Sequence, residues 1–131
     1  MILDSSAIVA VLTGEPQRAD IRRVARTASR LGISAGTLLE VGVVVDRRGQ
    51  PLLSRRLDAL LEEWQVEVHP VTESQARIGR AAYRDFGKGS GHPAGLNLGD
   101  CFSYALARET RRPLLFVGGD FVHTDVVDAL A

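Results

Sequence analysis

A helix pattern followed by a strand pattern occupies residues 96–120, which read LNLGDCFSYALARETRRPLLFVGGD. Asn97 suits the N-cap of a helix over Leu98–Arg111, because its side chain can accept a hydrogen bond from a free backbone N–H at the helix start. Pro113–Val117 is a short apolar run typical of a buried strand, and Gly118-Gly119 ends it. The stretch is therefore one helix-to-strand unit of the kind that α/β folds repeat.

The rest of the chain continues this alternation of helices and strands. The expected strands lie at residues 1–3, 32–35, 66–71 and 113–117, and Val126-Val127 is a candidate for a last edge strand. The expected helices lie at residues 5–12, 16–29, 37–48, 51–64, 72–86 and 98–111. Strands that alternate with helices imply a parallel sheet covered by helices on both faces. We therefore predict an α/β fold with three layers and a short central parallel sheet of four to five strands.

Length and composition fit one soluble domain that spans residues 1–131. Hydrophobic residues make up 45% and charged residues 24%, which is ordinary for a globular protein. No apolar run approaches the roughly 18–20 residues of a membrane span, and the N-terminus lacks the pattern of a signal peptide. The single cysteine, Cys101, fits a reducing cytosol. We therefore expect a cytoplasmic protein without membrane association.

The charges balance, with sixteen basic and sixteen acidic residues. Zero net charge taken alone argues against a nucleic-acid binder, because such proteins are usually basic. The basic residues are all arginine except Lys88. The arginine side chain presents a planar fork that suits phosphate as well as carboxylate. Where the acids and arginines lie therefore matters more than their sum.

Four acidic residues are expected at one edge of the sheet. Asp4 follows the first strand, and Asp120 follows the last one after a glycine turn. Glu40 and Asp100 lie in the first turns of predicted helices. Ligands of open α/β sheets bind beyond the carboxyl ends of the strands. Converging carboxylates raise each other's pKa, and a divalent cation relieves the repulsion. A set of oxygen ligands favours Mg²⁺ or Mn²⁺ over Zn²⁺.

Each acid also has a purely structural interpretation. Asp4 could cap the first helix, and Thr37–Glu40 matches a capping box. Asp100 lies where a negative charge favours the helix dipole, and Asp120 is a common turn residue. Because all four fall on the same edge, the metal site is the favoured interpretation.

Other catalytic patterns fit less well. Gly32–Gly36 matches the G-x-S-x-G nucleophile elbow around Ser34, but the chain is too short for an ordinary α/β-hydrolase. An aspartyl phosphatase or phospho-receiver would need a second nearby aspartate or a lysine late in the sheet. The glycine-rich stretch at residues 87–95 lacks the P-loop pattern, because Lys88 is followed by glycine.

Several segments spread over essentially the whole chain match one known family: Met1–Ala7, Ile33–Glu40, Phe86–Ala107, Pro113–Phe121 and Thr124-Asp125. In these segments the chain resembles the PIN-domain ribonucleases, and specifically the VapC-type toxins of bacterial toxin–antitoxin pairs. The chain departs from the family at Gly119, where related toxins often carry Asp or Asn, and at Ser5, where Thr is common. The resemblance implies a PIN-like α/β/α sandwich.

The resemblance also implies a role for each acid. Asp4 and Asp100 would be the principal metal ligands, and Glu40 and Asp120 would complete the acidic group directly or through water. Ser6 would hold a carboxylate or a phosphate in place. The expected activity is that of a Mg²⁺-dependent endoribonuclease, with Mn²⁺ as a possible alternative, in which the metal activates water for attack on phosphate. The products would carry 5′-phosphate and 3′-hydroxyl ends.

Partners follow from the same resemblance. The substrate would be structured or single-stranded RNA, such as tRNA or rRNA, and Lys88, His92 and Asn97 would lie on the substrate side of the site. The glycine-rich stretch could equally be a plain surface connection. A cognate antitoxin is expected, together with a homodimer whose contact lies on the apolar helices at Thr37–Val45 and Pro51–Trp64.

The competing hypothesis is a catalytically inactive PIN-like module for binding or assembly, in which the acids serve only as caps. In the enzyme hypothesis, zero net charge is the sum of an acidic centre and arginines that face phosphate or an antitoxin.

Overall fold

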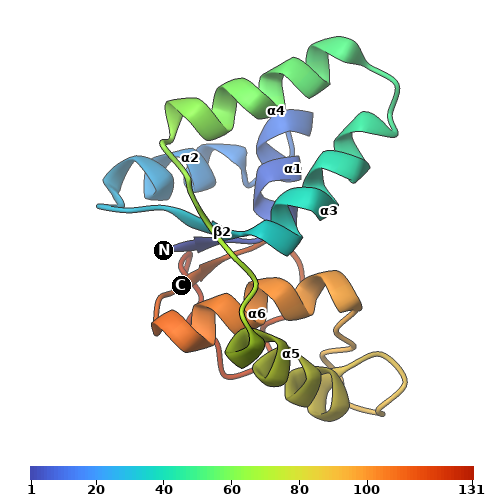
Figure 1. Ribbon diagram of the computed structural model, residues 1–131. Helices are drawn as coiled ribbons and strands as arrows, with labels where there is room; N and C mark the ends of the chain where they lie inside the picture. The colour runs from blue at the N-terminus through green and yellow to red at the C-terminus, as the bar shows by residue number, and fades with distance from the viewer.

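The computed structural model describes residues 1–131 and contains six helices and four strands (Figure 1). The strands are β1 (Ile2–Leu3), β2 (Gly32–Ser34), β3 (Glu67–His69) and β4 (Leu114–Leu115). The helices are α1 (Ser5–Thr13), α2 (Arg18–Thr27), α3 (Ala35–Asp46), α4 (Pro51–Glu63), α5 (Glu73–Phe86) and α6 (Leu98–Thr110).

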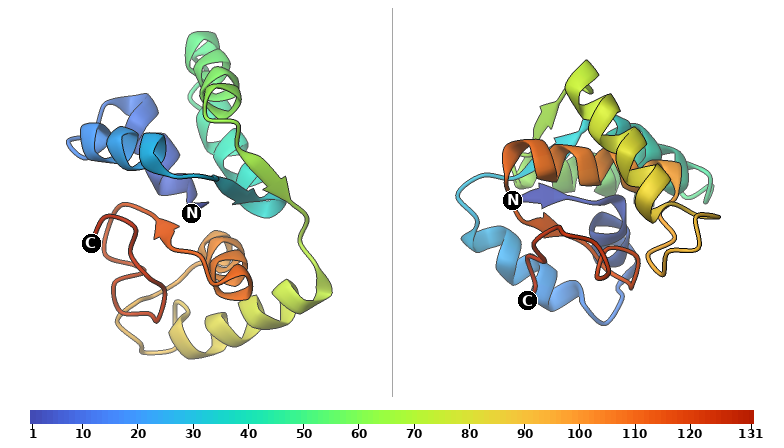
Figure 2. Two further views of the ribbon diagram at one scale, coloured as in Figure 1. Left: turned by 90° about the vertical axis from the view of Figure 1, so that its left-hand side faces the viewer. Right: turned by 90° about the horizontal axis from the view of Figure 1, so that it is seen from below.

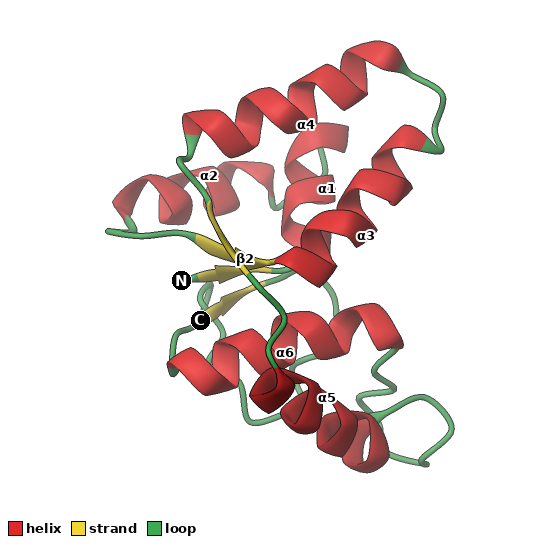
Figure 3. Ribbon diagram, in the orientation of Figure 1, coloured by secondary structure: helices red, strands yellow, loops and turns green.

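The strands form one parallel sheet in the order β3-β2-β1-β4. Figure 3 shows these short strands at the centre of the molecule, with helices above and below them. Helices α1 to α4 cover one face, and α5 and α6 cover the other, as the side view in Figure 2 also shows. The predicted α/β fold with a central parallel sheet is therefore confirmed, with four strands.

Alternation along the strands divides the core in two. Leu3 and Leu115 face the core under α1 to α4, whereas Ile2 and Leu114 face the core under α6. Successive side chains of a strand point to opposite faces, so even two-residue strands can supply both layers. All four of these side chains are fully buried, which fixes the register of β1 against β4.

Helices start at the carboxyl ends of the strands and are capped there by polar side chains. Asp4 caps α1 through a hydrogen bond from the Ser6 N–H, and Ser34 caps α3 through one from the Gly36 N–H. Helix α3 therefore starts two residues earlier than the sequence predicts, and Thr37 lies inside it. The capping-box interpretation of Thr37–Glu40 is wrong, since Ser34 already fills the N-cap position. The same cap buries Ser34 completely, and a buried hydroxyl does not suit a nucleophile.

Three further predictions need correction. Val126-Val127 forms no strand. The chain meets β4 only at a bridge between Leu114 and Asp128, because β4 is only two residues long. Tyr83 has apolar neighbours at helical spacing in the sequence, which favours a position in the core, but its side chain is exposed on α5.

Helix α4 is not apolar all round. It buries Leu53, Leu57 and Leu60 against the protein's own core, which leaves Leu52 as its exposed large apolar side chain. None of the helices combines the length and the hydropathy that crossing a bilayer requires.

Candidate active site

The four acids predicted from the sequence lie beyond the carboxyl ends of the strands. Asp4 directly follows β1, and Asp100 lies in the first turn of α6. Glu40 lies in the second turn of α3, and Asp120 lies in the loop after β4. The negative charges of Asp4, Asp120 and Glu40 all raise the pKa of Asp100. The fold therefore brings the four carboxyl groups within electrostatic reach of one another.

Asp4 is the most firmly held of the four. Its side chain is 2% exposed and accepts three hydrogen bonds. The Ser6 N–H and hydroxyl donate to Oδ2 at 3.1 and 2.6 Å, and the Ser103 hydroxyl donates to Oδ1 at 2.6 Å. These three donors contact both carboxylate oxygens, so they fix the orientation of the Asp4 side chain.

Two of these partners are themselves fixed by other elements. Ser6 Oγ accepts a hydrogen bond from the Val117 N–H at 3.0 Å, which links α1 to the chain after β4. Ser103 Oγ lies 3.0 Å from Thr37 Oγ1, and Thr37 is the donor in this pair because Ser103 donates to Asp4. The network therefore spans α1, α3 and α6.

Sequence reasoning identified Ser6 but missed Ser103 and Thr37. Both are fully buried polar residues on otherwise apolar stretches of helix. Ser103 follows Asp100 by three residues, which places the two side chains on one face of α6. A polar residue three positions after Asp100, in an otherwise apolar helix, is the feature of the sequence that could have identified Ser103.

Asp100 is buried, at 8% exposed, and lies in a different environment. Its Oδ2 accepts a hydrogen bond from the Asn97 N–H at 3.0 Å, and the Asp100 N–H donates to Asn97 Oδ1 at 2.9 Å. Burial raises the pKa of Asp100 to about 7, with the neighbouring acids adding to the shift and the Asn97 N–H opposing it. Near neutral pH this carboxyl group therefore needs either a proton or a cation.

Glu40 approaches α6 where a glycine leaves room. A Cβ atom on Gly99 would collide with Glu40 Oε2, so only glycine permits this approach without a shift of the glutamate. Burial raises the pKa of Glu40 and the charge of Asp4 adds to the shift, while the Ser5 side chain opposes it. Glu40 is therefore a second carboxyl group that a cation would stabilise as an anion.

Comparison with known proteins fits this geometry. A family model described as PIN domain matches residues 1–127. The chain belongs to the PIN domain family.

Among curated proteins, this PIN domain is 54% identical over 130 residues to ribonuclease VapC28 of Mycobacterium tuberculosis, which covers 99% of this chain and 98% of that protein. It is 46% identical over 126 residues to ribonuclease VapC42 of the same species, covering 96% of each chain. The predicted assignment to the VapC-type ribonucleases is confirmed, and the PIN domain is an endoribonuclease by class.

Solved structures share the fold of this PIN domain. One is VapC20 of Mycobacterium tuberculosis, described as a sarcin–ricin loop cleaving toxin, with a TM-score of 0.74, 19% identity, and coverage of 97% of this chain and 96% of that one. Another is a toxin–antitoxin complex from Klebsiella pneumoniae, with a TM-score of 0.72, 17% identity, and coverage of 99% and 97%. At these identities the likeness concerns the fold.

The remaining predicted residues of the PIN domain lie in the loop after β4, in the glycine-rich loop and at the start of α6. Asp120 is exposed, and its side chain makes no hydrogen bond to the protein. Lys88 is exposed in the glycine-rich loop. His92 is half-buried: its Nδ1 accepts a hydrogen bond from the Ala94 N–H at 3.1 Å, so part of its role is to shape that loop. Asn97 caps α6, as its spacing predicts.

The donor set suits a hard divalent cation. All four groups are carboxylates, and Oδ1 of Asp100 makes no hydrogen bond to the protein. The side chains do not already form a group of three metal ligands. Carboxylate oxygens are the ligands that Mg²⁺ and Mn²⁺ prefer, and a cation bound beside Asp100 would offset the burial that raises the pKa of this group.

Proposed function

We propose that this VapC-type protein is the toxin of a toxin–antitoxin pair and that it hydrolyses RNA with Mg²⁺ or Mn²⁺ held by Asp4, Asp100, Glu40 and Asp120. The observation that carries the proposal is the state of Asp100. Burial together with three neighbouring acids disfavours its charge, which a divalent cation would restore.

The side chains have distinct roles in this proposal. A bound cation supplies an activated water and neutralises charge on the scissile phosphate. Asp4 holds a fixed orientation, because the Ser6 and Ser103 hydroxyls constrain both of its oxygens. Glu40 approaches the start of α6 at Gly99, and the exposed Asp120 is near enough for its charge to raise the pKa of Asp100. Ser6 acts through Asp4, because its hydroxyl donates to Asp4 Oδ2.

The substrate in this proposal is a loop or unstacked segment of tRNA or rRNA. Proteins read single-stranded or looped RNA through bases that are splayed out of the stack. VapC20, which shares the fold, is described as cleaving the sarcin–ricin loop, an RNA of this kind. The exposed Lys88 lies on a loop next to the start of α6 and is the available cation for a substrate phosphate.

The inactive-module hypothesis is less favoured. Glu40 lies in no helix cap, so capping does not explain it. The relatives that match nearly the whole chain are named ribonucleases.

Metal-dependent cleavage is the test of the proposed function. The purified protein is incubated with total tRNA and rRNA in Mg²⁺, in Mn²⁺, and with a chelator, and the RNA ends are sequenced. We expect discrete cuts with 5′-phosphate ends that disappear with the chelator, and protection when the antitoxin encoded beside the toxin is co-expressed. Equal cleavage with and without the chelator would contradict the metal site.

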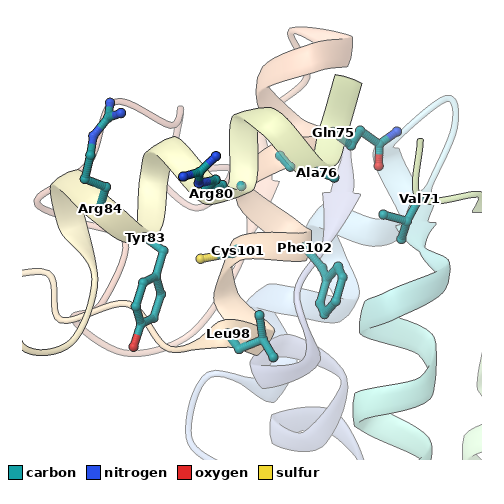
Figure 4. A pocket seen from close by; sticks show the side chains of 11 residues that line it. Val71, Gln75, Ala76, Arg80, Tyr83, Arg84, Leu98, Cys101 and Phe102 are labelled. Atoms are coloured by element: carbon teal, nitrogen blue, oxygen red, sulfur yellow. The ribbon is translucent and has the colours of Figure 1, made fainter. Parts of the chain in front are cut away.

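We also propose that the protein is a homodimer that buries an apolar surface on α5 and α6. A pocket of about 520 Å³ lies between these helices, and Tyr83, Leu98 and Phe102 line it (Figure 4). Leu98 is 71% exposed at its edge, and Leu39 of α3 is 70% exposed. Apolar surface of this kind marks interaction sites.

The sequence predicts a contact on the helices at Thr37–Val45 and Pro51–Trp64. The surface that we propose instead lies on α5 and α6, with the exposed Leu39 of α3 beside it, and does not include α4. We expect the mass in solution at micromolar concentration to be that of two chains, and Leu98→Glu to give one chain. A monomeric mass for the unchanged protein would refute the proposal.

A further inference from the structure

We propose that Tyr104 is a positioning residue that fixes two loops beside the acidic site, through a hydrogen bond from its hydroxyl to Asp125 and through packing of its ring on Phe86. The effect on cleavage rests on the proposed function, whereas the effect on the loops does not.

The first contact joins α6 to the loop that carries Asp120. The Tyr104 hydroxyl donates to Asp125 Oδ1 at 2.6 Å, and Arg108 Nη2 lies 3.4 Å from Asp125 Oδ2. Tyr104 is 6% exposed, and burial raises the pKa of its hydroxyl, so it remains a donor at physiological pH. A hydrogen bond to a charged acceptor is among the stronger contacts that a side chain can make.

This contact matters for Asp120 because the loop has few other anchors. Between β4 and the bridge at Asp128, the buried Phe121 packs on Phe116 with ring centroids 5.2 Å apart. Asp120 precedes Phe121 and has no hydrogen bond of its own. Its place beside Asp100 therefore depends on the anchors that follow it: the buried Phe121, which belongs to the same core cluster as Tyr104, and Asp125, which accepts a hydrogen bond from Tyr104.

The second contact joins α6 to the glycine-rich loop at residues 87–95. The Tyr104 ring lies 5.9 Å from that of Phe86, and the Phe86 ring lies 4.9 Å from that of His92 in an edge-on arrangement. The loop is closed at its base by hydrogen bonds between Phe86, Lys88 and Leu96. Tyr104 therefore packs against Phe86, the last residue of α5 before the glycine-rich loop begins.

The position of Tyr104 connects both contacts to the metal site. Tyr104 follows Asp100 by four residues, so the two side chains lie on one face of α6, one turn apart. A single side chain therefore sets the position of Asp120 and of the loop with Lys88 relative to Asp100.

Three variants test this inference, with Asp58→Ala as the matched control for Asp125→Ala, because the exposed Asp58 side chain on α4 makes no hydrogen bond to the protein. Tyr104→Phe keeps the ring and removes the hydroxyl. Asp125→Asn keeps an acceptor for Tyr104, and Asp125→Ala removes it. The measurements are amide hydrogen exchange of residues 118–127, thermal unfolding, kcat and KM for RNA cleavage, and the Mg²⁺ concentration that gives half-maximal rate.

We expect Tyr104→Phe and Asp125→Ala to speed exchange of residues 118–127 by about tenfold or more, with α1 and α4 unchanged. Both should lower kcat several-fold and raise the Mg²⁺ requirement. Asp125→Asn, which keeps an uncharged acceptor, should fall between the parent and Asp125→Ala, and Asp58→Ala should match the parent. A double variant, Tyr104→Phe with Asp125→Ala, should be no worse than Asp125→Ala alone.

The inference would be overturned if Tyr104→Phe kept both the hydrogen-exchange rates and the Mg²⁺ requirement of the parent. It would also be overturned if Asp125→Asn behaved like Asp125→Ala. If the parent protein itself cleaves no RNA, the proposed function fails, and the exchange data alone decide on the positioning role.

Discussion

Asp100→Asn is expected to abolish RNA cleavage and, without added metal, to make the protein more stable than its parent at pH 8. The loss of activity should reach at least about a hundredfold, because the variant removes a proposed metal ligand from the buried side of the site. The gain in stability follows from the electrostatic cost of the buried carboxylate that the substitution removes.

The sign of this effect follows from the pKa of Asp100, which is raised from 3.8 to about 7 in the folded protein. Well below pH 4 the group is protonated in both the folded and the unfolded chain, so it costs nothing. As the pH rises toward 7, the unfolded chain releases the proton more readily, and the folded state loses stability; above pH 7 the loss is complete. The loss is on the order of 2–4 kcal/mol, and asparagine avoids it.

Thermal unfolding of Asp100→Asn and its parent at pH 4.5 and pH 8, with a chelator present, measures this difference. The difference in unfolding temperature between Asp100→Asn and the parent should widen as the pH rises. The same difference should stay constant for the control Asp58→Asn, which changes an exposed acid on α4. Added Mg²⁺ should raise the stability of the parent and leave the variant largely unchanged. A variant that is less stable than its parent at pH 8 would contradict the proposed state of Asp100.

The acidic group was predictable from sequence because it depends on local order along the chain. Asp4 directly follows a strand, Asp100 starts a helix, and parallel strands bring such positions to one edge whatever their separation in sequence. The same reasoning supplied the parallel sheet and the cap at Asn97.

What holds the acids in place was not predictable, because it depends on how helices pack. Ser103 meets Asp4 across 99 residues, and Thr37 meets Ser103 across 66. The approach of Glu40 to Gly99 requires the crossing of α3 and α6 to be known. The exposure of Tyr83 likewise depends on where neighbouring elements end. The same is true of residues Val126-Val127, where a single bridge forms instead of a strand.

Asp4→Asn is expected to abolish cleavage as well, but with the opposite effect on stability. Asp4 accepts hydrogen bonds from the Ser6 N–H, the Ser6 hydroxyl and the Ser103 hydroxyl, whereas asparagine offers one oxygen and turns an NH₂ group toward the other donors. The Ser6 or Ser103 oxygen can accept from the new NH₂ group only if its own hydroxyl proton turns away to another acceptor, so the hydrogen bonds around residue 4 have to rearrange.

The cost of these lost hydrogen bonds is about 1–3 kcal/mol, so the unfolding temperature of Asp4→Asn should fall at pH 8. Unfolding of Asp4→Asn, Asp100→Asn and Asp58→Asn in one buffer with a chelator separates the two acids. If hydrogen bonds stabilise the Asp4 carboxyl group and burial disfavours the charge of Asp100, Asp4→Asn lowers the unfolding temperature and Asp100→Asn raises it, relative to Asp58→Asn. Shifts of both variants in the same direction would contradict these two different environments.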